Sequence, residues 1–75
     1  MKIEYDNEVD VLYIRIQEKE VCRTRELEEG VNLDLDEQGA IIGLEIIGAL
    51  ERYDRKDLFN IATENLAWDT TAQSA

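Results

Sequence analysis

The sequence contains no histidine, no proline, a single cysteine and a single methionine among its 75 residues. Without histidine, a serine or cysteine nucleophile has no imidazole base, so catalytic triads of that kind are excluded. A zinc site requires a cluster of cysteine and histidine ligands, whereas Cys22 is alone, and a disulfide within the chain is equally excluded. Carboxylates, arginines and tyrosines are the groups that remain for chemistry, and they usually serve structure and solubility.

Positive charge is also scarce, because 8 Lys and Arg stand against 18 Asp and Glu, for a formal charge of −10. Affinity for nucleic acid comes mostly from cations that neutralise phosphates, so this balance argues against a nucleic acid partner. It argues equally against docking on an anionic membrane. The negative field would speed encounter with a basic protein at low salt, although the same charge also keeps a small protein soluble.

Long apolar runs are absent too, and none reaches the roughly 18 residues that a membrane-spanning helix needs. Residues 1–6 carry acids where a signal peptide has its apolar core. Together with one unpaired cysteine, these features predict a protein of the reducing cytoplasm, with no membrane partner.

Alternating apolar and polar residues predict five β-strands in the first two-thirds of the chain. The breaks between them are short, which favours an antiparallel meander. The last strand is apolar on both sides, which indicates a central strand or one covered on each face. The expected strands cover residues 2–6, 11–17, 21–27, 31–36 and 40–47.

Turn residues separate the predicted strands. Gly30 is free to take a positive φ, and residues 36–39 fit a type I turn closed by a left-handed glycine. Asp6 and Asp10 bracket the first turn, where an Asp side chain capping a turn amide explains them more simply than a ligand role.

After residue 50 the hydrophobic period changes to that of a helix. Residues 55–67 are expected to form one amphipathic helix with its N-cap at Asp54. The fold class is therefore α+β: a meander of about five strands over residues 1–50, then one C-terminal helix in residues 51–68 that packs on the sheet in the same domain. Residues 69–75 are small and polar and are expected to form a flexible tail.

So small a core, without disulfide or metal, has a thin margin of stability, and a partner chain is the usual remedy. If the helix covers Ile42, Leu44 and Ile46, then Ile41 and Ile47 need cover from elsewhere. A second copy would supply it, so we expect a homodimer with Ile41 and Ile47 in its interface.

Glu45 interrupts an apolar run and must be paired or neutralised if it is buried. Arg15, Arg23 and Arg25 lie on strands that can supply a partner, with Tyr13 alongside. Tyr13, Arg15, Arg25 and Glu45 are thus candidates for an anion-binding or acid–base pocket. The alternative is a cross-strand ion pair on a polar face.

Asp34 and Asp36 project from the same face of one predicted strand and are candidate ligands for a hard divalent cation. The alternative is a solvated strand face that resists edge-to-edge aggregation. Residues 34–39 resemble only a fragment of a calcium loop, so we expect no cofactor. Cys22 is expected to be a small buried hydrophobe rather than a reactive thiol.

Several short motifs occur in an order that resembles the small bacterial family known as domain of unknown function 2283. They are Ile3-Glu4-Tyr5-Asp6, Asp10-Val11-Leu12-Tyr13-Ile14, Thr24-Arg25-Glu26-Leu27, Glu29-Gly30-Val31 and Gly43-Leu44-Glu45-Ile46. The resemblance covers about residues 1–50. It implies a compact, β-rich prokaryotic domain with no established activity or catalytic residues, and an antitoxin-like role as the partner of a small neighbouring protein.

We therefore expect a non-enzymatic interaction module, a small acidic homodimer that sequesters a basic protein. The alternative function is a small-ligand or metal-binding domain that uses the face of Arg15, Arg25 and Glu45 or the face of Asp34 and Asp36. An enzyme is the third hypothesis, because no positioned nucleophile or base stands out.

Overall fold

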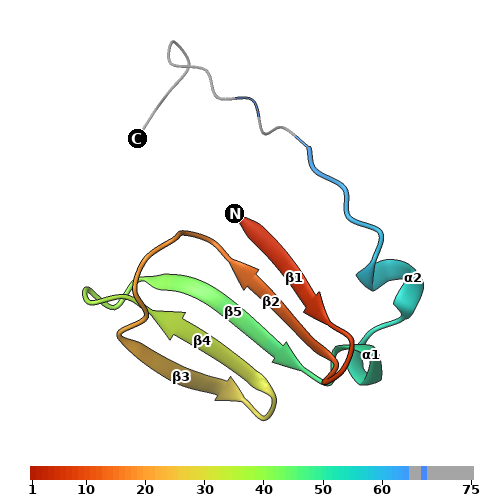
Figure 1. Ribbon diagram of the computed structural model, residues 1–75, viewed down its shortest axis with the longest axis horizontal. Helices are drawn as coiled ribbons and strands as arrows, with labels where there is room; N and C mark the ends of the chain where they lie inside the picture. Colours follow the sequence, from red (N-terminus) through yellow and green to blue (C-terminus); the bar gives the residue numbers. More distant parts are fainter. Residues whose placement is uncertain (65–66, 68–75) are drawn as a thin grey trace.

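Strands form at all five places where alternation predicts them, and the computed structural model shows one antiparallel sheet followed by two short helices (Figure 1). Residues 1–64 and residue 67 are described. The strands are β1 Lys2–Asp6, β2 Val11–Arg15, β3 Arg23–Glu28, β4 Val31–Leu35 and β5 Ile41–Ile47, and the helices are α1 Ala49–Arg52 and α2 Arg55–Leu58. The protein is mainly β.

The strand order is β1-β2-β5-β4-β3, so the predicted meander is wrong in its connectivity. A meander would place β3 beside β2, but β5 occupies that position. The reason lies in composition: β5 is apolar on both sides and belongs at the centre, as predicted, whereas every residue of β3 is exposed. Charged residues at an edge also discourage pairing with other chains.

The strand register separates two faces of the sheet, because residues directly opposite each other share a face. Leu33, Leu44 and Ile14 lie in one row across three strands. The apolar face, defined by this row, contains Ile3, Tyr5, Leu12, Ile14, Arg23, Arg25, Val31, Leu33, Leu35, Ile42, Leu44 and Ile46. The polar face contains Lys2, Glu4, Asp6, Val11, Tyr13, Arg15, Thr24, Glu26, Asn32, Asp34, Gly43, Glu45 and Ile47.

The predicted single helix over residues 55–67 is wrong. α2 ends at Leu58, and residues 60–64 are not helical, while residues 65–66 lie outside the described part of the chain, as does the predicted tail. Asp54 is the N-cap residue of α2, as predicted. Asn60 and the β-branched Ile61 have low helix propensity. A short helix that packs on nothing is only marginally stable in water.

Both helices lie at one end of the sheet, and neither covers a face of it (Figure 1). The two helices therefore do not cover Leu44 and Ile46, the case considered above, and both side chains are half-buried. α2 is followed by Phe59, whose ring meets that of Tyr5 edge-on with centroids 5.0 Å apart. Neither helix in the described residues has the length and apolar character needed to cross a lipid bilayer.

Buried apolar residues are few. Among the residues that the structure describes, they are Val31, Leu35, Ile42 and Ala49. Leu35 at the end of β4 and Ile42 near the start of β5 lie beside the β4–β5 turn. Residues 16–22, which connect β2 to β3, pass this end of the sheet (Figure 1). The middle of the apolar face stays open.

Candidate functional site

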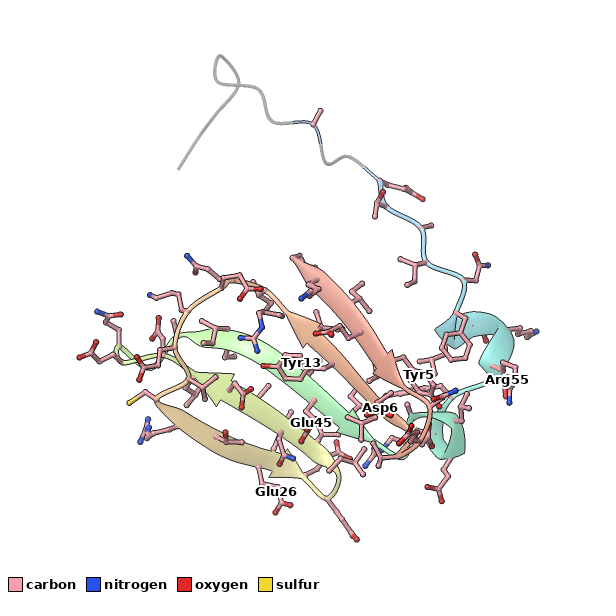
Figure 2. The ribbon with its side chains drawn as sticks, viewed as in Figure 1. Tyr5, Asp6, Tyr13, Glu26, Glu45 and Arg55 are labelled. Atoms are coloured by element: carbon pink, nitrogen blue, oxygen red, sulfur yellow. The ribbon has the colours of Figure 1, made fainter. Side chains whose placement is uncertain are left out.

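The predicted site residues on the polar face surround a glycine of the central strand. Tyr13 lies on β2 beside β5 (Figure 2). A Cβ atom placed on Gly43 would lie 2.1 Å from the Tyr13 hydroxyl oxygen, so only glycine leaves room for this ring. The hydroxyl crosses β5 and donates a hydrogen bond of 2.5 Å to Asp34 Oδ2 on β4. Two non-adjacent strands are thereby joined over the central one.

Further hydrogen bonds extend this arrangement across the face. Thr24 on β3 donates to Asp34 Oδ1 at 2.8 Å. Asn32 on β4 donates through Nδ2 to Glu45 Oε1 on β5 at 2.9 Å. Within the described residues, no buried side-chain nitrogen or oxygen lacks a hydrogen-bond partner. A fully satisfied network of this kind fixes strand positions.

Tyr13 acts in this network as a donor. Burial and the hydrogen bond to the Asp34 carboxylate both raise the pKa of the Tyr13 hydroxyl, because each disfavours a phenolate. The hydroxyl therefore stays protonated at neutral pH and does not serve as a general base. The Arg15 guanidinium lies over the Tyr13 ring, 5.2 Å from its centroid, and 3.9 Å from a Glu18 oxygen.

The structure brings together three of the four candidate pocket residues. Tyr13, Arg15 and Glu45 share the polar face, whereas Arg25 lies opposite Leu33 and therefore on the apolar face. Half-buried Glu45 is paired with the Asn32 amide rather than with an arginine. Alternation in β3 is too poor to assign its residues to faces from the sequence.

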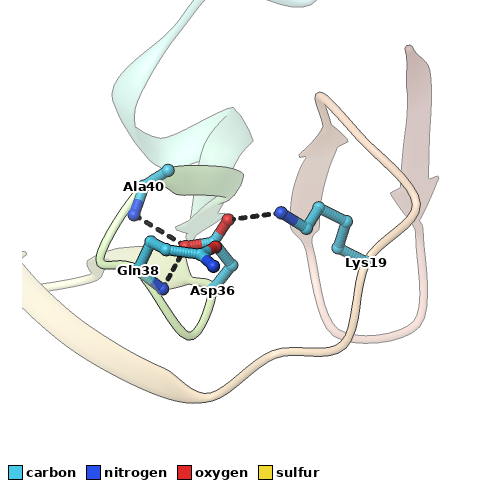
Figure 3. Close-up of polar contacts among 4 residues, drawn as sticks. All are labelled: Lys19, Asp36, Gln38 and Ala40. Atoms are coloured by element: carbon cyan, nitrogen blue, oxygen red, sulfur yellow. Dashed lines mark hydrogen bonds and ion pairs between the residues drawn. The ribbon is translucent and has the colours of Figure 1, made fainter.

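The two candidate cation ligands hold different partners. Asp36 lies after β4, and its Oδ1 accepts hydrogen bonds of 2.9 Å from the backbone amides of Gln38 and Ala40 (Figure 3). Its Oδ2 accepts one of 2.8 Å from Lys19 Nζ. Asp34 is engaged by Tyr13 and Thr24, as described above. Residues 1–64 and 67 contain no group of three or more acidic or cysteine side chains suited to a metal ion.

Removing the Lys19 ammonium is expected to make the fold more sensitive to acid. Lys19 and the Ala40 and Gln38 amides lower the pKa of Asp36. A depressed folded pKa contributes stability that is present above the ordinary value of about 3.9 and is lost as pH falls through the folded pKa. Lys19→Met should thus shift acid unfolding, followed by circular dichroism, to higher pH.

Lys56→Met is the matched control for that experiment. Lys56 is exposed, and its substitution removes the same charge as Lys19→Met. It should leave the midpoint of acid unfolding near that of the wild type. Equal midpoints for Lys19→Met and Lys56→Met would contradict the role given to the Lys19–Asp36 pair.

Asp6 and Asp10 cap backbone amides. Asp6 Oδ1 accepts a hydrogen bond of 2.9 Å from the amide of Glu8, which confirms the turn prediction. The Asp10 carboxylate accepts a hydrogen bond of 2.8 Å from the Tyr5 hydroxyl. It also accepts hydrogen bonds from the backbone amide of Leu50 in α1, at 3.0 and 3.1 Å to its two oxygens. Sequence reasoning missed this contact because it spans 40 positions, which local turn patterns do not report.

The predicted interface residues lie at the two ends of β5. Ile41 is 48% exposed and Ile47 is 46% exposed, and Ile47 lies opposite Val11 on the polar face. Cys22 is exposed, so its predicted burial is wrong. It directly precedes the edge strand β3, where no neighbouring element of the described chain covers it.

Comparison with known proteins places the sheet in a family. The family model described as a protein of unknown function (DUF2283) matches residues 2–49. The chain belongs to this family. The match runs from the start of β1 to the first residue of α1, so the DUF2283 region is the five-stranded sheet, and the predicted resemblance is confirmed. No curated protein and no solved structure matches the chain.

Proposed function

We propose that this DUF2283 protein is a non-enzymatic interaction module of the cytoplasm that binds a basic protein through its polar face. The observation that supports the proposal is an excess of carboxylates on that face over the cations Lys2 and Arg15. The carboxylates are those of Glu4, Asp6, Glu26, Asp34 and Glu45.

A shallow hollow on this face offers a place for a basic side chain. It has a volume of about 550 Å³ and includes Glu4, Asp6, Tyr13 and Glu45 in its lining. Asp6 and Glu45 each accept one hydrogen bond in the fold. Since a carboxylate has about four acceptor sites, both retain capacity for a lysine or arginine of a partner.

The chemistry of the face supports binding over catalysis. Tyr13 is held as a protonated donor, and the polar-face hydrogen bonds within the described chain pair its groups with each other. The ligand-binding alternative receives less support, because Arg25 and Glu45 are on opposite faces. An antitoxin-like role, in which this chain masks a basic partner, fits the −10 charge.

The proposal is tested by affinity capture from the source cells. At low salt, the protein should recover a stoichiometric basic protein, and the complex should dissociate at high salt because exposed charge pairs are screened. Recovery of this protein alone at low salt would overturn the proposal.

Two triple variants of equal net charge locate the binding face. Glu4→Gln, Asp6→Asn and Glu45→Gln together neutralise the hollow and should weaken partner binding by about tenfold, which is about 1.4 kcal/mol. The control replaces exposed Glu29, Glu37 and Glu51 with Gln and should weaken it by less than about threefold, since only long-range attraction changes. Equal losses would argue against this face.

A further inference from the structure

The apolar face of the sheet has no cover over its centre within the described chain. Leu33 and Leu44, at the middle of β4 and β5, are half-buried, and Ile3 on β1 is 42% exposed. Among the described residues, Ile42 is the one large side chain that is fully buried. A contiguous apolar patch of this kind on a soluble protein marks an interaction surface.

A lone chain of this size has few other means of support. Small domains commonly depend on disulfides, a structural metal or association. A single cysteine excludes an internal disulfide. Among the residues that the structure describes, no three acidic or cysteine side chains come together in a way that could hold a metal ion. Association through the open face is the remaining means.

Charge restricts which surface two copies of this chain can share. Two molecules that each carry −10 repel each other, and only a surface without carboxylates allows close approach. The regularly paired strand residues of the apolar face include no Asp or Glu. Beyond the bulge in β3, Glu28 lies opposite Val31 and so shares this face, and Arg52 lies 3.5 Å from its carboxylate.

The margin of the face is complementary to an acidic protein. Arg23 and Arg25 lie along β3 on the apolar face, and neither forms an ion pair with any residue that the structure describes. Arginine at the rim of an apolar patch is typical of protein interfaces. In a second copy, the carboxylates for these arginines would come from the rim of the face, where Glu28 lies opposite Val31.

We infer that the apolar face packs against the same face of a second copy, forming a two-layered β-sandwich dimer. Sheets that pack face to face bury their apolar sides about 10 Å apart. With strands about 4.8 Å apart and about 3.4 Å per residue, five strands of about five residues span about 400 Å² of flat sheet. Two such faces amount to about 800 Å² of flat sheet, the size of a weak interface, so the dimer should dissociate measurably on dilution.

Sedimentation equilibrium of the purified chain, in reductant because Cys22 is exposed, tests the inference. The expected species has twice the 8.7 kDa chain mass, and its affinity should hold or rise with salt as repulsion is screened. Binding of the basic partner, in contrast, is expected to weaken with salt, and that partner is absent from the purified sample. Failure of the dimer proposal can therefore be distinguished from failure of the proposed function.

Two isoleucines of similar exposure, on opposite faces, locate the interface. Ile3 is 42% exposed on the apolar face, and Ile47 is 46% exposed on the polar face. Ile3→Lys should raise the dimer dissociation constant tenfold or more, whereas Ile47→Lys should change it less than about twofold. Should Ile3→Lys fail to fold by circular dichroism, Arg25→Glu on the exposed edge strand supplies the second probe and should also weaken the dimer.

Two results would overturn the inference. One is a mass of 8.7 kDa at every concentration up to the millimolar range, which would leave the face to this chain's own C-terminal residues or to another protein. The other is dissociation by Ile47→Lys but not by Ile3→Lys or Arg25→Glu, which would place the dimer interface on the polar face.

Discussion

Replacing Asp10 with alanine is expected to lower the free energy of unfolding by about 2.5–5 kcal/mol at a fixed protein concentration. The carboxylate caps the Leu50 amide at the start of α1, and losing such a cap costs about 0.5–2 kcal/mol. The Tyr5 hydroxyl also loses its acceptor, worth about 1 kcal/mol. Asp10 has φ 55°, a left-handed conformation that disfavours alanine by about 1–2 kcal/mol.

Two variants separate these contributions in urea unfolding experiments. Asp10→Gly removes the carboxylate and relieves the backbone, so it should cost less than alanine by about 1 kcal/mol. Asp10→Asn keeps an acceptor oxygen and tolerates the left-handed region, so it should be the mildest change. If the alanine, glycine and asparagine variants all had the free energy of unfolding of the wild type, Asp10 would not hold α1 against the sheet.

Replacing Gly43 with alanine is expected to destabilise the fold by about 2–3 kcal/mol. The added Cβ would lie 2.1 Å from the Tyr13 hydroxyl oxygen and 2.8 Å from ring atom Cζ. The ring must therefore move away and lose its bond to the Asp34 carboxylate, and a hydrogen bond to a charged group is worth about 1.5–3 kcal/mol. Elsewhere in a strand, glycine to alanine is favourable, since glycine weakens strands.

A double-mutant cycle isolates this contact. In a Tyr13→Ala background the obstacle is absent, so Gly43→Ala should cost less than about 0.5 kcal/mol or stabilise the protein. The same loss in both backgrounds would mean that Gly43 is required for a reason other than the Tyr13 ring.

The strands and their turns could be predicted from the sequence because their determinants are local. Alternation marks β1, β2 and β4 clearly, and Gly30 and Gly39 take a positive φ, as predicted, with values of 81° and 84°. The two-sided apolar pattern of residues 40–47 indicated a central strand or one covered on each face, and the central position is confirmed. These features depend on neighbours within a few positions.

Other features could not be predicted because they depend on contacts between distant segments. The place of β5 between β2 and β4 is a property of the whole sheet, and it decides that Tyr13 crosses Gly43 to reach Asp34. Poor alternation in β3 left the face of Arg25 undetermined. Helical periodicity after residue 54 overestimated α2, because periodicity alone does not supply the packing that a short helix needs.

The sheet separates two kinds of surface, and each proposal concerns one of them. The polar face carries the carboxylates for a basic partner, while the apolar face carries almost none and is proposed to meet its own copy. Because the faces point in opposite directions, a dimer would present two polar faces outward. One assembly would then bind two basic partners.

Hydroxyl-radical footprinting of the wild-type protein tests most directly whether the apolar face is covered in solution. The expected result is protection of Leu33 and Leu44 at high protein concentration, with rapid oxidation of Ile47, and loss of that protection on dilution or in Ile3→Lys. Oxidation of Leu33 and Leu44 that does not change with concentration would contradict the account.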